Sequence, residues 1–340
     1  MDTKLRKTAN TIIKLLVVAF TFVFLYDQLV NRHDLENILP YFSEIYGKQG
    51  VEVLLLLVAL LLLVNLSLET YKWKFVISKL EDVPFFIALK AVFAGMAVSM
   101  FMPNRVGDYL GRVFILKRAD RLQAILITIL GSLAQLVTTL LFGIFSAFFY
   151  YPIVFDISIP FHRWIYSGLI VGGIILGIIL VFGFLHFNTF SLIIKWISGR
   201  GYKRIRKYTN VFLMFHFREL LWILVISIAR YLVFSLQFFL LLQIFQIPIA
   251  YFPAMMLIGM VYLFMTGIPT IALTEFGIRS SVSITIFEYY YLSTGAWNES
   301  FVFGIAAASS LLWVINLVLP AIVGIVFIFS LRFIRKDNVD

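Results

Sequence analysis

The feature that most constrains this chain is a series of apolar runs, each about as long as a bilayer-spanning helix. A helix needs about 20 mainly apolar residues to cross the hydrocarbon core of a membrane. Only 14% of the 340 residues are charged, whereas soluble domains carry about a quarter. We therefore predict an all-α polytopic membrane protein with about six full transmembrane helices. The clear runs are 11–30, 51–71, 122–150, 164–186, 219–246 and 300–331.

The basic residues predict how these helices are oriented. Lysine and arginine are enriched in the cytoplasmic loops of membrane proteins. The loops after alternate runs hold only Arg32, Lys48 and Arg163. We therefore expect a multi-pass protein of the cytoplasmic membrane with both termini in the cytoplasm, and no bound nucleic acid despite the net charge of +10. Most of the basic residues cluster at the other helix ends, at 4–7, 72–79, 117–121, 187–218 and 332–336.

Two further apolar segments, 84–118 and 253–293, do not fit this alternation. The first lies between two basic clusters and the second between two loops without basic residues, so each must leave the membrane at the face where it entered. Each is interrupted by a proline, Pro103 or Pro269. Proline removes a backbone donor and disfavours helix for the residue before it. We therefore predict two re-entrant helical hairpins, one from each face.

The order of these elements repeats with opposite orientation. Residues 1–150 and 163–334 each contain two helices, a hairpin and a helix, first from the cytoplasmic side and then from the outer side. We expect a single transmembrane domain over residues 1–340, built as an inverted-topology repeat. In transporters with such repeats, the substrate often binds where discontinuous helices of the two halves meet.

Both interruptions are followed by an acidic residue and, four residues later, an arginine. These are Asp108 with Arg112 and Glu275 with Arg279. Residues at i and i+4 share a helix face, and Arg105 would share the face of the first pair. Charges inside a bilayer must face protein or a water-filled cavity, and the first N–H groups of a helix attract anions. We therefore predict a substrate site for phosphate or carboxylate here. An alternative is that each pair is a salt bridge within its own helix.

Four more residues belong to the predicted substrate site. Gly107 and Gly277 would let a headgroup approach the backbone, and Asn104 is a suitable N-cap residue. Arg230 lies near the middle of an apolar span, where a buried arginine needs a partner. Its candidate partners are Asp108, Glu275 and a substrate phosphate, or structural contacts with a carboxylate or backbone carbonyls.

Asn65 and Glu69 stand one turn apart near the predicted cytoplasmic end of the run 51–71. We interpret them as a polar face at the membrane interface, with a role in the site as the alternative.

The sequence around the two interruptions resembles that of a known family. The stretches "PNRVGDYLGRVFILKR", "IPTIALTEFGIRSSVSI" and "ETYKWKFV" are similar to motifs of the lysylphosphatidylglycerol synthase transmembrane-region family, the flippase-like domain of multiple peptide resistance factors. The resemblance implies translocation of a lipid, or assistance to it. Two-domain members also carry a soluble aminoacyl transferase domain. Because this chain stops at Asp340, we expect a stand-alone member without the aminoacylation activity.

We therefore expect a lipid flippase or transporter that moves a phosphate-containing lipid across the membrane. Its partner would be a membrane lipid with an anionic or zwitterionic headgroup, with polyprenyl phosphate among the candidates. The chain has no cysteine and no grouping of histidines or nucleophiles typical of a metal or catalytic site, so we expect no enzymatic activity, metal or cofactor. The alternatives are a secondary transporter of a small anion and a non-catalytic accessory subunit of a membrane glycosyltransferase or lipid synthase.

Overall fold

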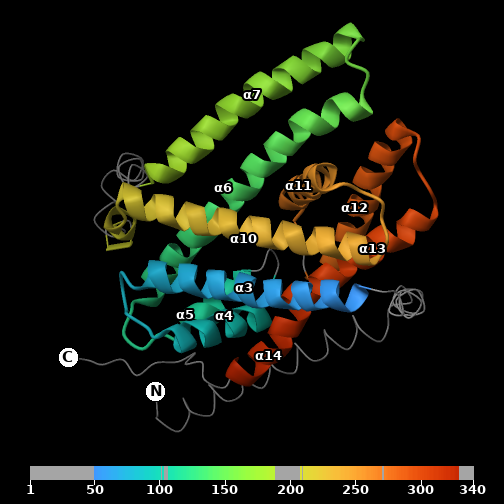
Figure 1. Cartoon of the computed structure of the whole chain (residues 1–340). Coiled ribbons are helices and arrows are strands. Elements are labelled where there is room, and N and C mark those ends of the chain that lie inside the picture. Colours follow the sequence, from blue (N-terminus) through green and yellow to red (C-terminus); the bar gives the residue numbers. More distant parts are fainter. Residues whose placement is uncertain are drawn as a thin grey trace.

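The computed structural model describes residues 50–100, 102, 106–187, 207–208, 210–269 and 272–328, with the backbone alone for 272–274. All regular elements in this part of the chain are helices (Figure 1). Five of them are long and apolar enough to cross a membrane, which confirms the predicted all-α polytopic fold. The predicted span 11–30 lies outside the described residues. The five are α3 (Val51–Ile77), α6 (Arg121–Val154), α7 (Pro160–Leu185), α10 (Phe217–Ile244) and the continuous helix Ser300–Ile328.

Local signals explain where several of these helices begin. The carboxylate of Asp120 accepts hydrogen bonds from the backbone N–H groups of Leu122 and Gln123, and so caps the first turn of α6. Pro160 occupies the start of α7, where its missing N–H costs nothing. The cap at Asp120 and the proline at 160 set the first residues of α6 and α7. Hydrophobicity alone predicts such helix starts only to within a few residues.

The last long helix changes its winding in the middle. It consists of α13 (Ser300–Trp313), a π-helical turn η4 (Val314–Val318) and α14 (Leu319–Ile328). Pro320 cannot donate a hydrogen bond to the carbonyl of Asn316, so a regular α-helix is disfavoured at this point. Such π-turns are frequent at functional sites, and this one carries Asn316 into the polar network described below.

The two predicted interruptions are present. α4 (Phe85–Ser99) and α5 (Val106–Val113) flank the interval that contains Pro103, and α11 (Tyr251–Gly267) and α12 (Ala272–Thr294) flank Pro269. The two pairs are unequal, because α5 has 8 residues and α12 has 23. At 1.5 Å per residue, α12 rises about 35 Å, so this arm is as long as the hydrocarbon core is thick.

Polar contacts join the helix ends at one end of the bundle, which we call the basic end. Lys79, just after α3, forms an ion pair of 2.6 Å with Glu219 at the start of α10. The carboxylate of Glu81 accepts hydrogen bonds from the backbone N–H groups of residues 117–119, between α5 and α6. Both ends of the α4–α5 pair therefore lie at the basic end, on the left in Figure 1.

The α11–α12 pair begins and finishes at the opposite end of the bundle. The hydroxyl of Tyr291, near the end of α12, donates to the carbonyl of Pro248, between α10 and α11, at 3.3 Å. Two helix pairs that return to opposite ends are what two re-entrant hairpins from opposite faces require. The re-entrant topology of 84–118 and 253–293 and the inverted repeat of 1–150 and 163–334 stay predictions.

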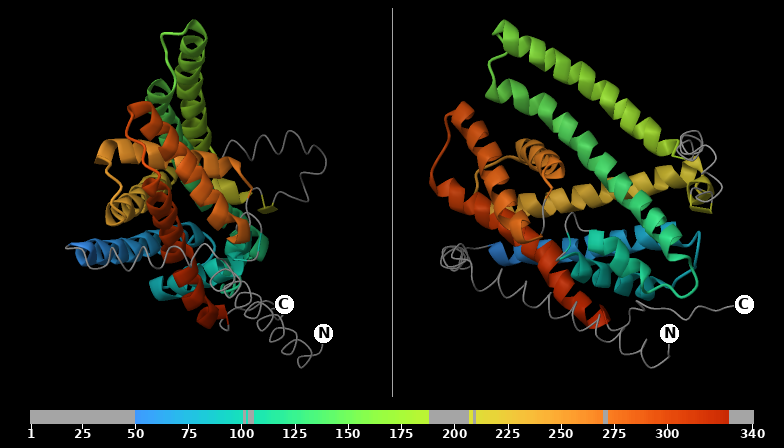
Figure 2. Two further views of the ribbon diagram at one scale, coloured as in Figure 1. Left: turned by 90° about the vertical axis from the view of Figure 1, so that its right-hand side faces the viewer. Right: turned by 180° about the vertical axis from the view of Figure 1, so that it is seen from behind.

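Small residues bring the short helices close to their neighbours. A Cβ on Gly107 or Gly111 of α5 would collide with the backbone of α4, so only glycine permits this contact. α4 in turn packs against α3 and α14, and α6 packs against α11. α7 lies at the edge of the bundle beside α6, as both views in Figure 2 show. The packing of α5 against α4 places the first acid–arginine pair next to Glu69, in the second half of α3.

Candidate substrate-binding site

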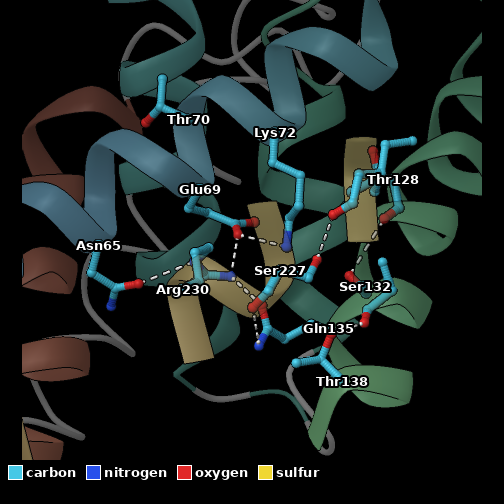
Figure 3. A network of polar contacts seen from close by, with 12 residues as sticks. Asn65, Glu69, Thr70, Lys72, Thr128, Ser132, Gln135, Thr138, Ser227 and Arg230 are labelled. Atoms are coloured by element: carbon cyan, nitrogen blue, oxygen red, sulfur yellow. Dashed lines mark hydrogen bonds and ion pairs between the residues drawn. The ribbon is translucent and has the colours of Figure 1, made fainter. Parts of the chain in front are cut away.

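Glu69 of α3 is the centre of a buried network of charges. Its side chain contacts Lys72, one turn further along α3, at 3.0 Å. It also forms ion pairs with Arg112 of α5 and with Arg230 of α10. Figure 3 shows the carboxylate of Glu69 between Lys72 and Arg230. One carboxylate therefore compensates cations on three helices, which allows these charges to lie inside an apolar bundle.

Arg112 joins the first predicted pair to this network. Its Nε donates to Oδ1 of Asp108 at 2.8 Å, and its Nη2 contacts Oδ2 at 2.5 Å. The predicted i, i+4 pair therefore forms, with the two-pronged geometry that favours arginine over lysine. The pair is more than a salt bridge within α5, because Arg112 also reaches Glu69.

Arg230 makes structural contacts inside the bundle rather than an ion pair with either named candidate, Asp108 or Glu275. Its Nε donates to Oδ1 of Asn65 at 3.0 Å, and its Nη1 donates to Oε1 of Gln135 in α6 at 3.3 Å. Its ion-pair partner is Glu69, so the structural pair with a carboxylate, one of the alternatives left open by the sequence, is the one that forms among the described residues. The reason is that α10 packs along α3, which places the middle of α10 level with Glu69.

The interpretation of Asn65 and Glu69 as an interfacial polar face was also wrong. Each is 6% exposed, and Lys72 is 3% exposed. The helix continues to Ile77, which leaves Glu69 two turns inside its end. Asn65 also donates from Nδ2 to Oδ1 of Asn316 at 3.0 Å, so it links α3 to the π-turn as well as to α10.

A second charged centre lies on α12. Arg279 donates from Nη2 to Oε1 of Glu275 at 2.6 Å, and both residues are buried. The two side chains therefore form the salt bridge within one helix that the sequence left open as the alternative to a substrate site. The acid–arginine pair with i, i+4 spacing therefore occurs twice, once on α5 and once on α12.

Both charged centres face the same space inside the bundle. A cavity of about 570 Å³ is lined by Arg230, Glu275 and Arg279. An adjoining cavity of about 340 Å³ is lined by Glu69, Asp108, Arg112, Arg230 and Arg279. Because Arg230 and Arg279 line both, the two hollows are contiguous. Volumes of this size suit a small molecule or a lipid headgroup.

The charges around this space are not balanced. The described lining residues include four cations and three carboxylates, which leaves one positive charge in excess. A concave site with excess positive charge attracts anions. The four cations are Lys72, Arg112, Arg230 and Arg279, and the three carboxylates are Glu69, Asp108 and Glu275.

The two predicted glycines do not approach this space. Gly107 is buried against α4, where an added Cβ would collide with the carbonyl of Val98. Its role is therefore helix packing and not contact with a headgroup. Gly277 is half-buried in α12 and is absent from the described lining of both cavities. Asn104 and Arg105 lie outside the described residues.

Comparison with family models matches residues 11–294 to the Lysylphosphatidylglycerol synthase TM region. The chain belongs to this family. Comparison with curated proteins and with solved structures gave no match. All charged residues that line the two cavities fall within the matched segment, whereas the helix Ser300–Ile328 follows it.

In this member of the Lysylphosphatidylglycerol synthase TM region family, sequence reasoning assigned Asn65 and Glu69 a role in the site only as an alternative, and Lys72, Gln135 and Asn316 were not predicted to belong to it. Asn65, Glu69 and Lys72 follow the spacing i, i+4, i+7, so they share one face of an otherwise apolar helix. That spacing was a usable signal of an inward-facing polar stripe. Gln135 and Asn316 each stand alone in an apolar span, and only the tertiary structure shows their partners.

Proposed function

We propose that this protein is a lipid flippase or lipid transporter that moves a phosphate-containing lipid across the cytoplasmic membrane. The observation that carries the proposal is the pair of contiguous cavities inside the bundle, with Arg112, Arg230 and Arg279 in their walls and a surplus of positive charge. Membership of the family supports a membrane protein of this kind.

The network around Glu69 prepares the arginines for an anion. An isolated charge in the membrane is costly, and the shared carboxylate reduces that cost while no ligand is bound. A lipid phosphate offers oxygens that suit the guanidinium geometry as well as a carboxylate does. In our proposal, the phosphate enters beside Arg112 and Arg230 and competes with Glu69 for their N–H groups. The acyl chains stay in the surrounding bilayer, and no covalent step is involved.

The proposal includes a topology. Both termini are cytoplasmic, and the basic end of the bundle faces the cytoplasm. The α4–α5 and α11–α12 pairs enter as re-entrant hairpins from opposite faces. Relative movement of the two halves would then expose the cavities to each side in turn, as in other transporters with inverted repeats.

The first test is lipid translocation in proteoliposomes that contain fluorescently labelled phosphatidylglycerol. An impermeant reductant bleaches only the outer leaflet unless the protein exchanges lipid between leaflets. We expect exchange with the wild-type protein. Arg230→Gln should slow it at least about tenfold, because loss of one partner of a buried charge pair costs about 2–5 kcal/mol and about 1.4 kcal/mol is a factor of ten.

Arg163→Gln is the matched control, since Arg163 is exposed in the first turn of α7. It should exchange lipid at the wild-type rate, and both variants should elute as monodisperse protein. Exchange no faster than in empty liposomes, or a wild-type rate for Arg230→Gln, would contradict the proposal. Uptake of free inorganic phosphate without lipid exchange would favour the small-anion transporter instead.

A further inference from the structure

Two buried residues that line the 340 Å³ cavity each carry an N–H group without a hydrogen-bond partner within the described part of the chain. These groups are Nε of Arg279 and Nε1 of Trp313. Arg279 is 7% exposed and Trp313 is 3% exposed. Buried donors without an acceptor are rare in native proteins, and each calls for an explanation. A ligand in the cavity would provide one.

The chemistry of these groups restricts what could satisfy them. The guanidinium and the indole N–H can only donate hydrogen bonds. The missing partner must therefore be an acceptor, in practice an oxygen. Trp313 has no charge, and the charge of Arg279 is already compensated by Glu275. This acceptor need not carry a negative charge of its own.

Contacts between α12 and α13 hold the two donors on neighbouring helices. The rings of Phe276 and Trp313 meet edge to face, with their centroids 5.6 Å apart. The hydroxyl of Ser280 lies 3.2 Å from the hydroxyls of Ser309 and Ser310. Phe276 and Ser280 lie on either side of Arg279 in the chain, so the contacts fix the segment of α12 that carries Arg279 next to Trp313.

The arginines around Glu69 differ from Arg279. Arg112 and Arg230 each contact at least one carboxylate of another helix, and Arg230 also donates to two amide oxygens. The excess positive charge belongs to this first group, in which three cations face the carboxylates of Glu69 and Asp108. The cavity therefore offers charge on one wall and uncompensated donors on another.

We propose that Arg279 and Trp313 form a second subsite, which binds an oxygen of the lipid headgroup beyond the phosphate, such as a hydroxyl. The phosphate itself lies at Arg112 and Arg230. This inference rests on the proposed function, and it makes the protein selective for phospholipids whose headgroup carries a further oxygen. Arg279 lies within the segment that matches the family and Trp313 follows it, so the subsite combines a residue from the matched segment with one from α13.

The test uses two charge-matched probes, dioctanoyl phosphatidylglycerol and dioctanoyl phosphatidylpropanol, which differ only in the two hydroxyls of the headgroup. Binding to the full chain in nanodiscs is measured for wild type, Trp313→Phe and Trp222→Phe. Trp313→Phe keeps an aromatic ring against Phe276 and removes the N–H. Trp222 is exposed on α10 and serves as the matched control.

We expect Trp313→Phe to weaken binding of phosphatidylglycerol about tenfold, the effect of one hydrogen bond of about 1.4 kcal/mol, and to leave phosphatidylpropanol unchanged. Trp222→Phe should change neither. Arg279→Lys, which keeps the charge and removes Nε, should reproduce the selective loss and replaces Trp313→Phe if that variant does not fold. In wild type, the 15N-indole signal of Trp313 should move with phosphatidylglycerol only.

Three outcomes would overturn the inference. If both variants bind phosphatidylglycerol as wild type does, the donors contact something other than the headgroup, such as water. If the variants bind both lipids more weakly by the same factor, Trp313 and Arg279 affect the cavity as a whole and not one headgroup oxygen. In either case the proposed function survives, because wild type still binds. If wild type binds neither probe, the inference and the proposed function both fail.

Discussion

At the scale of single residues, the site depends on one carboxylate that serves several cations. Glu69 contacts Lys72, Arg112 and Arg230. Its removal would leave the buried Lys72 and Arg112 and the half-buried Arg230 with only Asp108 nearby. Each cation has a smaller effect, because its removal leaves the others still paired with Glu69. Glu69 should therefore contribute more to the stability of the protein than any one of the three cations does.

Glu69→Gln should destabilise the protein by about 3–5 kcal/mol, the usual cost of removing one partner of a buried ion pair. Unfolding by denaturant in detergent micelles measures this. Glu52→Gln is the matched control, because Glu52 is exposed in the first turn of the same helix, and it should change stability by less than about 0.5 kcal/mol. Equal effects of the two substitutions would show that Glu69 is not the centre of the network.

The acid–arginine pairs were predictable from sequence, but the network was not. Asp108 with Arg112 and Glu275 with Arg279 are four residues apart, so helix geometry alone brings them together. The contact between Glu69 and Arg112 spans 43 residues, and that between Asn65 and Arg230 spans 165. No local pattern encodes which of several polar residues meet across such distances, so the sequence left the partner of Arg230 open and did not identify Glu69.

At the scale of helices, the close approach of α5 to α4 positions Asp108 and Arg112. Gly107→Ala should destabilise the protein by about 1–3 kcal/mol, because the new methyl group collides with backbone, which cannot move aside cheaply. Gly168→Ala on α7 is the control, since nothing lies within 4 Å of its added Cβ, and it should be neutral or stabilising. The midpoint temperatures of thermal unfolding of the two variants and of the wild-type protein measure this difference. A neutral Gly107→Ala would mean that α5 does not rest on α4.

The start of α6 gives a prediction about pH. The hydrogen bond from Lys207, 2.6 Å away, holds the pKa of Asp120 below its usual range. A carboxyl with a lowered folded-state pKa stabilises the protein above the ordinary pKa near 4, and this contribution is lost as the pH falls through the lower folded-state value. Both side chains are partly exposed, so the effect is small.

Asp120→Asn isolates this charge effect, because asparagine also caps helices well. We expect the variant to lose less stability than wild type when the pH falls from about 6 towards 3, with equal helix content by circular dichroism. Parallel losses in the two proteins would show that the ion pair does not contribute.

The helix boundaries show which helix ends hydrophobicity predicts correctly and which it does not. The runs 122–150 and 219–246 correspond closely to α6 and α10. The run 51–71 was predicted too short because Lys72 was read as a marker of the loop. Lys72 is in fact buried next to Glu69, and a lysine that is paired inside a helix has the same sequence signature as one that ends it.

At the scale of the whole molecule, the two broken helix pairs return to opposite ends of the bundle. The absence of cysteine from the sequence allows single cysteines to be placed without background labelling. Cysteines replacing Asp82 and Arg118 should react with an impermeant maleimide from one side of the membrane only. Cysteines replacing Ala250 and Ala296 should react only from the other. All four positions are exposed in the structure.

Labelling in sealed vesicles, before and after permeabilisation, gives the answer. Reaction of Asp82→Cys and Arg118→Cys from opposite sides would mean that 84–118 crosses the membrane and does not re-enter. The same reasoning applies to the second pair and segment 253–293. This alternation of ends could be predicted from sequence because it depends on loop charge, which is local, and not on which helices touch.

The single excess positive charge of the cavity wall has an electrical consequence. A phospholipid whose only charged group is its phosphate, such as phosphatidylglycerol, carries one negative charge, so the described wall and such a headgroup together are neutral. Moving one elementary charge across a membrane potential involves about 2.3 kcal/mol per 100 mV. The membrane potential would contribute almost no energy to movement of the cavity with the anionic lipid bound, and the full energy of one charge to movement of the empty cavity. If the proposed lipid transport is correct, voltage should therefore act on the return of the empty protein and not on the step that moves the bound anionic lipid.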